Sequence, residues 1–248
     1  ERASEIAVRA CFSNAGQLCI SMERMYINEK VYDEFVAAFV ARVKAMTLKP
    51  GVGWGSDMGS LISQKQFDTV QGHVDDAVAK GATVLAGGRA RPDIGPLYYE
   101  PTVLEDVTRD MRACIQETFG PVVSLYKVQN DEEAIDRAND TEYGLNAAVL
   151  TRDTKHGRKV AARLHAGTVN INEGYASAWG TTSAPMGGMG ASGIGRRHGT
   201  EGLLKYTESQ TVAVQRLVRI APQFGMNDEQ WGHFMALSLS AMKKMGMS

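Results

Sequence analysis

The chain has 248 residues, of which 44% are hydrophobic and 22% are charged, and its formal net charge is -1. This composition is typical of a soluble globular fold that buries a sizeable core, either as one large α/β domain or as two small domains. Because 27 basic side chains are scattered among 28 acidic ones, the sequence argues against a nucleic-acid partner.

The first residues are expected to form a helix. Small or apolar side chains recur there with helical spacing, at Ala3, Ile6, Ala7, Ala10 and Cys11. The pattern ends at "NAG", residues 14–16, which is a typical helix stop. Neither an initiator methionine nor a clear N-cap precedes it, so we interpret the sequence as a piece of a longer protein.

Strands and helices then alternate along the chain. Apolar runs predict strands at 21–28, 82–88, 98–107, 121–128, 147–152 and 167–172, and helical spacing predicts helices around 32–46, 67–78, 130–140 and 153–165. A glycine-rich loop, "KPGVGWGSDMGS", precedes the second of these helices, and Asn130 and Glu133 have the spacing of a capping box. This alternation indicates an α/β fold with an open, mostly parallel sheet and helices on both faces.

The remainder of the chain is less regular. Residues 173–199 are rich in glycine and small side chains, so a loop is expected there, whereas "TESQTVAVQR" predicts a late strand and 226–248 predicts a Met-rich helix. We therefore expect a main domain at 1–206, a separate strand at 207–216 and a helical tail at 217–248.

The three cysteines are Cys11, Cys19 and Cys114, an odd number without pair or metal spacing. We therefore expect neither a disulfide framework nor a metal site. We expect a cytoplasmic location, where thiols stay reduced. Because the sequence has no signal peptide and no apolar run long enough to span a bilayer, membrane attachment is not expected.

Cys19 has two interpretations. Beside Leu18 and Ile20, a cysteine is more often an inert small hydrophobic residue. However, the short segment 14–17 at a helix end leaves backbone N–H groups free to point at a developing oxyanion, as acyl chemistry on a nucleophilic thiol requires.

Glu117 is a second candidate, because it lies two residues before Phe119 and just ahead of an apolar strand. Ligands of open parallel sheets bind where strands meet loops, but a solvated acid before a Phe-Gly-Pro turn is the simpler interpretation.

A glycine-rich loop is the third candidate. It contains a literal G-x-G-x-x-G at Gly188, Gly190 and Gly193. The dinucleotide-binding fingerprint needs a preceding strand and an acid about 20 residues later. Because both are missing, we interpret this segment as a flexible loop beside an active site.

Taken together, these stretches resemble the aldehyde dehydrogenase superfamily. "FSNAGQLC" is similar to its cysteine signature, "ETFGP" to its cofactor-contact motif, "PMGGMGASGIGRRHG" to its glycine-rich C-terminal loop and "YTESQTVAV" to its closing strand. Their order and spacing agree from Ala3 to about Gln215. The resemblance implies the Rossmann-like catalytic domain of this family.

The resemblance also implies roles for individual residues. Cys19 is similar to the catalytic thiol, which forms a thiohemiacetal and then a thioacyl enzyme, and its backbone N–H to half of an oxyanion hole. Asn14 is similar to an asparagine with a positioning role. Glu117 and Phe119 are similar to the acid and the ring that contact the nicotinamide ribose and the nicotinamide of NAD or NADP.

The family's cofactor domain, its "ELGG" general base and a second oxyanion-hole asparagine are expected upstream of the cysteine, and none is in this sequence. We therefore expect the 248-residue chain to be inactive by itself. The sequence leaves NAD versus NADP open.

The sequence leaves the substrate open. Its motifs are most similar to those of bacterial succinate-semialdehyde dehydrogenases. However, enzymes well matched to that substrate carry an arginine six residues before the nucleophile, where this sequence has Ser13. A serine cannot hold a carboxylate as a guanidinium does, so an apolar or aromatic aldehyde is an alternative. The residues expected to line the aldehyde pocket are Phe12, Ser13, Ile20, Tyr175 and Trp179.

Two other functions fit the same resemblance: a CoA-acylating aldehyde dehydrogenase and a non-catalytic assembly domain. In the family, the strand at 207–216 extends a partner subunit's sheet, which implies a homodimer or homotetramer. The tail is expected to be an amphipathic helix that covers a domain surface or a subunit contact.

Overall fold

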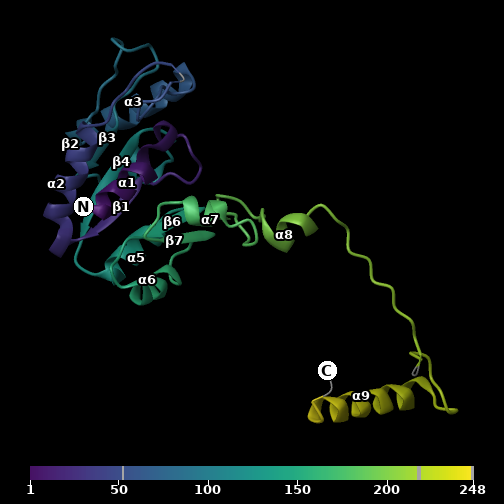
Figure 1. Cartoon of the computed structure of the whole chain (residues 1–248). Coiled ribbons are helices and arrows are strands. Elements are labelled where there is room, and N and C mark those ends of the chain that lie inside the picture. Colours follow the sequence, from purple (N-terminus) through teal and green to yellow (C-terminus); the bar gives the residue numbers. More distant parts are fainter. Residues whose placement is uncertain (52, 217–218, 247–248) are drawn as a thin grey trace. The chain divides into compact units, whose positions relative to one another are not determined.

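The computed structural model describes residues 1–51, 53–216 and 219–246, which form two compact units, Glu1–Thr207 and Glu208–Ser248 (Figure 1). Position 52 of the expected glycine-rich loop, and positions 217–218 and 247–248 of the expected tail, lie outside the described residues.

The main sheet of the first unit has four strands in the order β1-β4-β3-β2. They are β1 (Arg24–Asn28), β4 (Val122–Val128), β3 (Thr102–Glu105) and β2 (Thr83–Ala86). β4 pairs in parallel with β1 and with β3, and β2 is an antiparallel edge strand. The prediction of a mostly parallel sheet is therefore confirmed.

The later strands do not join this sheet. β6 (Asn146–Val149) and β7 (Thr168–Ile171) form a separate parallel pair, and β5 (Tyr143–Gly144) and β8 (Met189–Gly190) a short antiparallel pair. The sequence did not predict this division into separate sheets, because pairing between distant strands leaves no mark in a local apolar pattern.

The helices of the first unit are α1 (Arg2–Phe12), α2 (Glu29–Lys44), α3 (Gln64–Ala79), α4 (Arg112–Ile115), α5 (Asp131–Asn139), α6 (Thr154–Ala161), α7 (Ala176–Gly180) and α8 (Gly199–Leu204). Of these, α1, α2, α3, α5 and α6 correspond to predicted helices. α7 and β8 lie within the segment 173–199 that was expected to be a loop.

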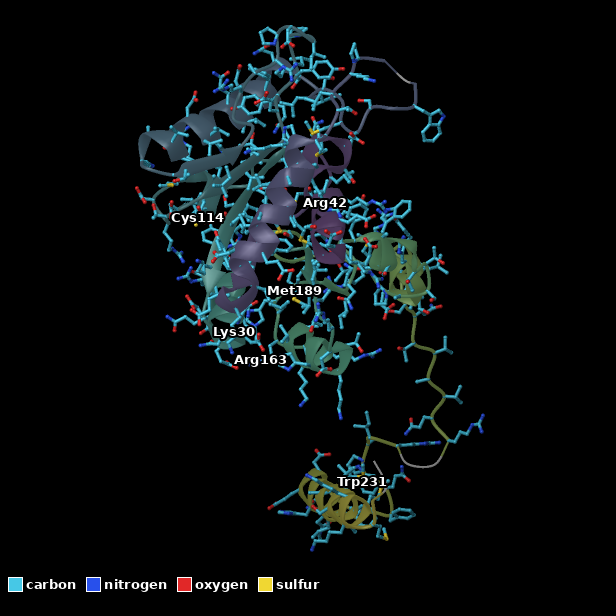
Figure 2. The ribbon with its side chains drawn as sticks, turned by 60° about the vertical axis from the view of Figure 1, so that its left-hand side comes forward. Lys30, Arg42, Cys114, Arg163, Met189 and Trp231 are labelled. Carbon is cyan, nitrogen blue, oxygen red and sulfur yellow. The ribbon has the colours of Figure 1, made fainter. Side chains whose placement is uncertain are left out.

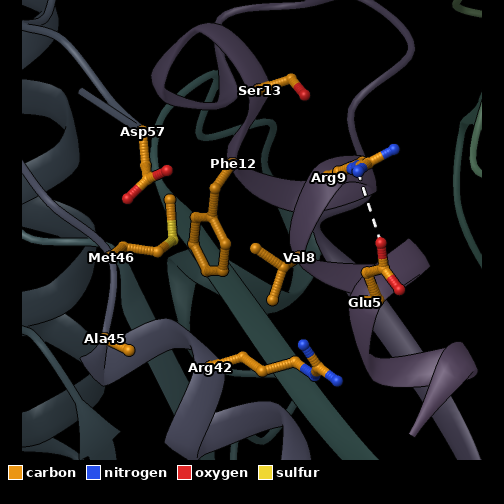
Figure 3. Close-up of a pocket in the computed structure, with 9 residues that line it drawn as sticks. All are labelled: Glu5, Val8, Arg9, Phe12, Ser13, Arg42, Ala45, Met46 and Asp57. Carbon is orange, nitrogen blue, oxygen red and sulfur yellow. Dashed lines mark hydrogen bonds and ion pairs between the residues drawn. The ribbon is translucent and has the colours of Figure 1, made fainter. Parts of the chain in front are cut away.

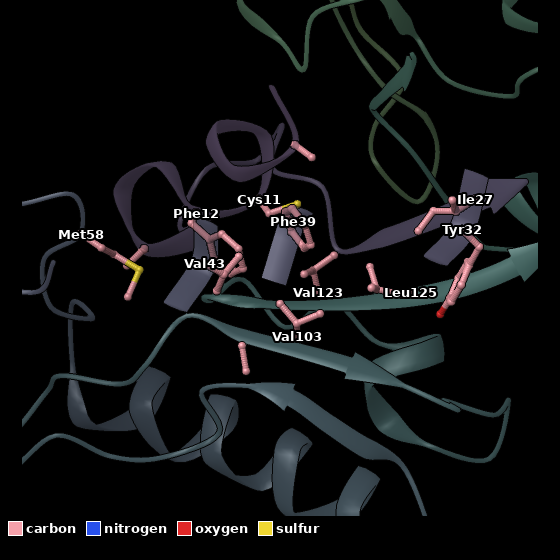
Figure 4. Packing of buried hydrophobic residues seen from close by; sticks show 13 residues of the cluster. Cys11, Phe12, Ile27, Tyr32, Phe39, Val43, Met58, Val103, Val123 and Leu125 are labelled. Carbon is pink, nitrogen blue, oxygen red and sulfur yellow. The ribbon is translucent and has the colours of Figure 1, made fainter. Parts of the chain in front are cut away.

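Both faces of the main sheet are covered by helices, as predicted. Side chains alternate along a strand, so neighbouring residues of β4 face opposite ways. Val123 and Leu125 pack with α1 and α2 in one buried cluster (Figure 4), and Val122 and Tyr126 pack with α3 in the other. The rings of Phe12 and Phe39 stack between α1 and α2 at 6.2 Å. This packing fixes the end of α1, from which the loop that carries Cys19 departs.

The start of α5 shows half of the predicted capping box. The Asn130 side chain accepts the Glu133 N–H at 3.0 Å, but the Glu133 carboxylate accepts the Gln129 N–H, at 2.8 Å, in place of the Asn130 N–H. The asparagine therefore satisfies one of the free N–H groups of the first helical turn.

Replacing Asn130 with alanine is expected to lower the free energy of unfolding by about 1 kcal/mol, because the Glu133 N–H loses its acceptor. Asn130→Ser keeps a side-chain oxygen at the cap and should recover most of this loss. Urea denaturation of both variants measures the difference, and equal stability of the two would show that the cap contributes nothing.

Residues 208–216, which include most of the expected late strand, have no helix or strand assigned in the structure. A strand is defined by hydrogen bonds to a neighbouring strand, so the pairing of this segment with a partner subunit stays a prediction.

The expected tail helix is present as α9 (Asp228–Lys244), which begins with a capping box between Asn227 and Gln230. Trp231, marked in Figure 2, is buried, and its indole N–H donates to the Ile220 carbonyl at 2.7 Å. Among the described residues, no helix combines the length and the apolarity needed to cross a bilayer.

Candidate active site

The loop that carries Cys19 begins with an abrupt change of backbone direction after α1. Asn14, Ala15 and Gly16 all have positive φ, at 54°, 56° and 69°. The Asn14 side chain donates to the Gln17 carbonyl at 3.1 Å, which braces this strained segment. The loop then turns through Cys19, whose side chain is exposed.

Gln17 ties this loop to the segment before α3. Its side-chain oxygen accepts the Ile62 N–H at 2.8 Å, and its side-chain nitrogen donates to the carbonyls of Asn14 and Ser60 at 3.2 and 3.3 Å. The Gln17 side chain therefore joins the Cys19 loop to residues 60–62.

The three cysteines differ in their access to solvent. Cys19 is exposed and Cys114 is half-buried, whereas Cys11 is only 1% exposed. Burial, with a smaller contribution from the Glu23 carboxylate, raises the pKa of the Cys11 thiol. Cys11 therefore stays protonated near neutral pH, and Cys19 is the thiol that a small electrophile reaches most easily.

The turn that carries Glu117 and Phe119 is held by side chains from two other segments. The Glu23 carboxylate accepts the N–H groups of Thr118 and Phe119, both at 2.8 Å, and Gln66 donates to the carbonyls of the same two residues at 2.7 and 2.9 Å. Glu117 itself is exposed and Phe119 is half-buried, with a positive φ of 49°.

His73 of α3 adds a further contact to this turn. Its Nδ1 and the Thr118 hydroxyl share a hydrogen bond of 3.1 Å. Burial and, secondarily, the Arg112 guanidinium lower the pKa of His73, so the ring is neutral at pH 7. The turn is thus anchored to α3 through uncharged groups.

The Cys19 loop and the Glu117 turn approach each other closely through their backbones. A Cβ atom placed on Gly16 would lie 2.0 Å from the Gly120 carbonyl oxygen, and the φ of +69° at Gly16 also favours glycine. The structure therefore brings together the Cys19 loop and the turn of Glu117 and Phe119, which are about one hundred residues apart in sequence.

Asn146 connects the Cys19 loop to the segment around Tyr175. Its side-chain nitrogen donates to the carbonyls of Ile20 and Gly174, at 2.9 and 3.1 Å, and its oxygen accepts from Asn170 at 2.9 Å. Asn170 in turn accepts the N–H of Ala178 in α7, also at 2.9 Å.

Tyr175 and Trp179, two of the expected pocket residues, lie at the N-cap and within α7. Tyr175 is half-buried and Trp179 is 56% exposed. Through Asn146 and Asn170, these two aromatic residues are positioned relative to the backbone next to Cys19, whereas Ile20 itself is 6% exposed.

The β5–β8 pair joins the glycine-rich loop to the segment after α5, with Tyr143 opposite Gly190. Burial and the Glu142 carboxylate raise the pKa of Tyr143. No helix begins at Gly193 in this described segment, so the G-x-G-x-x-G is not arranged as a dinucleotide-binding turn.

Ser13 and Phe12 line a pocket of about 320 Å³ between α1, α2 and the loop after α2 (Figure 3). The remaining lining residues are Glu5, Val8, Arg9, Arg42, Ala45, Met46 and Asp57. Phe12 is 1% exposed and points toward Met46, whereas the Ser13 hydroxyl points away from that ring (Figure 3). Two acids balance the two arginines, so the pocket has no excess positive charge.

The side chains of the described residues fit a nicotinamide cofactor better than a metal ion. In residues 1–51, 53–216 and 219–246, no group of three or more His, Cys, Asp or Glu side chains could hold a metal ion. The exposed Glu117 carboxylate beside the Phe119 ring offers an acceptor for sugar hydroxyls and an apolar surface for a flat ring, which fits one end of such a cofactor.

Sequence patterns did not reveal the residues that hold these loops together. Gln66 and His73 belong to α3, Asn146 belongs to β6 and Glu23 directly precedes β1. Their importance comes from contacts over 22 to 126 residues of sequence.

Comparison with known proteins assigns residues 1–212 to the model of the aldehyde dehydrogenase family. A protein of Mycobacterium ulcerans named "putative succinate-semialdehyde dehydrogenase (NADP(+)) 2" is 60% identical over 231 residues, which is 93% of this chain and 45% of that protein. The chain thus spans about half the length of the curated relatives it matches.

Two solved structures of betaine aldehyde dehydrogenase from Staphylococcus aureus share the fold. One, in complex with NAD+, gives a TM-score of 0.78 at 36% identity and covers 83% of this chain and 41% of its own. The other, a point mutant with NAD+ and a BME-modified cysteine, gives a TM-score of 0.80 at 35% identity and covers 90% and 46%.

Proposed function

The chain belongs to the aldehyde dehydrogenase family, and we propose that it is the catalytic-domain part of an NAD(P)+-dependent enzyme that oxidises an aldehyde to a carboxylic acid. The observation that carries the proposal is the contact between the loop of the exposed Cys19 and the turn of Glu117 and Phe119. A BME-modified cysteine in the Staphylococcus aureus relative is consistent with a reactive thiol in this fold.

In the proposed reaction, the Cys19 thiolate attacks the aldehyde carbon, and the carbonyl electron pair moves to oxygen. The Cys19 backbone N–H donates to that oxyanion, which stabilises the thiohemiacetal. When bound, NAD(P)+ accepts the hydride, and water then cleaves the thioacyl enzyme to release the acid and the thiol. Asn14 keeps the loop in shape through its bond to the Gln17 carbonyl.

Glu117 and Phe119 hold the nicotinamide end of the cofactor in this proposal. The exposed carboxylate accepts hydrogen bonds from ribose hydroxyls, and the Phe119 ring packs against the nicotinamide. A relative is named for NADP+ and a solved neighbour is in complex with NAD+, and these names support NAD(P)+ without separating the two.

The 248 residues contain no "ELGG" stretch, so we propose that they do not turn over by themselves. The test of the function uses the natural protein that contains this chain, with aldehyde and NAD+ or NADP+, and follows formation of the reduced cofactor. Absence of turnover with either cofactor and a panel of aldehydes would refute the proposal.

Assays on the same natural protein distinguish two alternative functions, a CoA-acylating dehydrogenase and a non-catalytic assembly domain. Acyl transfer to CoA requires added CoA for product formation, whereas hydrolysis does not. A non-catalytic assembly domain predicts that an electrophile labels Cys19 no faster than Cys114, whereas a nucleophile predicts selective labelling of Cys19, measured by intact and peptide mass.

The proposed substrate is an aldehyde, with succinate semialdehyde favoured by the name of the 60% identical relative. Ser13 favours a second candidate, because its hydroxyl offers no positive charge to hold a substrate carboxylate. An uncharged aldehyde is therefore the alternative.

Ser13→Arg is expected to raise the ratio of kcat/KM for succinate semialdehyde over butanal by about tenfold or more, since an added guanidinium favours the carboxylate. Ser13→Gln adds length without charge and serves as the control. An equal change in both variants would mean that the size of the side chain, and not its charge, controls this pocket.

We further propose that residues 207–216 pair with the sheet of a partner subunit, giving a homodimer or homotetramer in the cytoplasm. The alternation around Val212 and Val214, both exposed in the single chain, supports a strand that is completed by another subunit.

A further inference from the structure

We propose that Glu23 is a positioning residue that fixes the Glu117–Phe119 turn relative to the Cys19 loop and thereby sets the binding of the nicotinamide end of the cofactor. This inference rests on the proposed dehydrogenase function. It concerns a residue that lies four positions after Cys19 and would not itself touch the reacting atoms.

The contact of Glu23 with the turn is specific. One carboxylate oxygen accepts the Thr118 N–H and the other accepts the Phe119 N–H, both at 2.8 Å. Two successive N–H groups that point at one acceptor form a concave backbone site of the kind that binds anions in proteins. Here the acceptor is the chain's own Glu23 carboxyl group, 95 residues earlier in sequence. Burial raises the pKa of this carboxyl, and the two hydrogen bonds from Thr118 and Phe119 oppose that rise only in part.

The turn needs such a partner because its backbone is strained. Phe119 has a φ of 49°, in the left-handed region that residues with a Cβ rarely adopt. Gln66 satisfies the two carbonyl groups of Thr118 and Phe119 from the side of α3. Glu23 accepts hydrogen bonds from their N–H groups. Removing the Glu23 carboxyl would therefore leave these two N–H groups without a partner, while the two carbonyl groups keep their bonds to Gln66.

Glu23 also connects this turn to the Cys19 loop. Its backbone carbonyl accepts the Ser124 N–H of β4 at 2.9 Å. Just before it, the Ser21 hydroxyl donates to the Cys11 carbonyl at 3.0 Å, which fastens the same segment to the end of α1. Together with the Gly16–Gly120 contact, Glu23 gives the two loops a second point of attachment.

With two points of attachment, the Glu117 turn is held in one orientation relative to the Cys19 loop, whereas with one it could rotate about that point. A shift of about 1 Å between a reacting carbon and its acceptor is enough to slow a reaction about 10²-fold. Glu117 and Phe119 are the contacts that would transmit such a shift to the cofactor, while the Cys19 thiol keeps its own supports at Gln17 and Asn146.

The experiment compares wild type, Glu23→Gln and Glu23→Ala in the natural protein that contains the chain. We expect the Kd and KM for NAD(P)+ to rise about tenfold to a hundredfold in both variants, because the paired hydrogen bonds that hold the turn are broken. The KM for aldehyde and the rate at which iodoacetamide alkylates Cys19 without cofactor should stay within about twofold of wild type.

Glu133→Gln is the matched control, since the Glu133 carboxylate also accepts a backbone N–H, that of Gln129, at 2.8 Å. It should lower stability slightly and leave the cofactor Kd unchanged. If the Glu23 variants melt at lower temperature but bind the cofactor as wild type does, the proposal is wrong and Glu23 is only structural.

A second measurement needs no variant. In the wild-type protein, the Thr118 and Phe119 amides should be protected from hydrogen exchange by about 10²-fold or more, and exchange at the rate of free amides would overturn the proposal. Failure of the proposed function has a different signature: wild type would then show no NAD(P)+-dependent turnover and no cofactor binding, whatever stands at position 23.

Discussion

Replacing Cys19 with serine in the natural protein is expected to lower kcat/KM for aldehyde oxidation by at least about 10⁴-fold. A serine hydroxyl is almost fully protonated near neutral pH and is a far weaker nucleophile than a thiolate, so the first covalent step is lost. Steady-state rates with saturating cofactor measure the effect. Because the Cys19 side chain is exposed, the thermal unfolding midpoint and the cofactor Kd should change little.

Cys114→Ser is the matched control for this experiment, because Cys114 is half-buried and lies in α4, outside the Cys19 loop. It should keep activity within about twofold of wild type. Retention of more than about a hundredth of the wild-type rate by Cys19→Ser would remove Cys19 from the mechanism.

Gly16→Ala is expected to destabilise the protein by about 3 kcal/mol or more. Two costs add: the alanine would be held at a left-handed φ of +69°, and its Cβ would lie 2.0 Å from the Gly120 carbonyl oxygen. Since the contacting atoms are backbone, neither loop can relieve the clash by a rotamer change. Both the Cys19 loop and the Glu117 turn must shift, so activity should fall together with stability.

Gly59→Ala provides the comparison, because a Cβ there meets no heavy atom within 4 Å and the backbone is not left-handed. It should change the free energy of unfolding by less than about 1 kcal/mol. The two variants are compared by urea unfolding and by cofactor-dependent turnover. Equal stability of the two would show that the Gly16–Gly120 approach is not required.

The sequence predicted the elements whose signals are local. Helical spacing located α2 and α3, and the apolar run of β4 marked a strand buried on both faces. It also singled out Cys19 and Glu117 as candidates, and the resemblance to a family joined them in one site.

The remaining features depend on distant partners. Residues 208–216 have an alternating pattern, but no strand is assigned there within this chain. The division into separate sheets depends on which strands pair, and the pairing of β5 with β8 joins residues that periodicity does not relate. The Glu23 contact had no sequence signal, because a glutamate before an apolar strand is usually a solvated side chain.

In the proposed enzyme, the amide of Asn146 has a consequence for altering the range of aldehydes. One side chain holds both the Ile20 carbonyl, next to Cys19, and the Gly174 carbonyl, just before Tyr175. Substitutions that shift α7 would therefore also move the backbone next to Cys19, and their effects are expected to combine non-additively with changes near it. Libraries that vary the two segments jointly will reach solutions that stepwise improvement of either one misses.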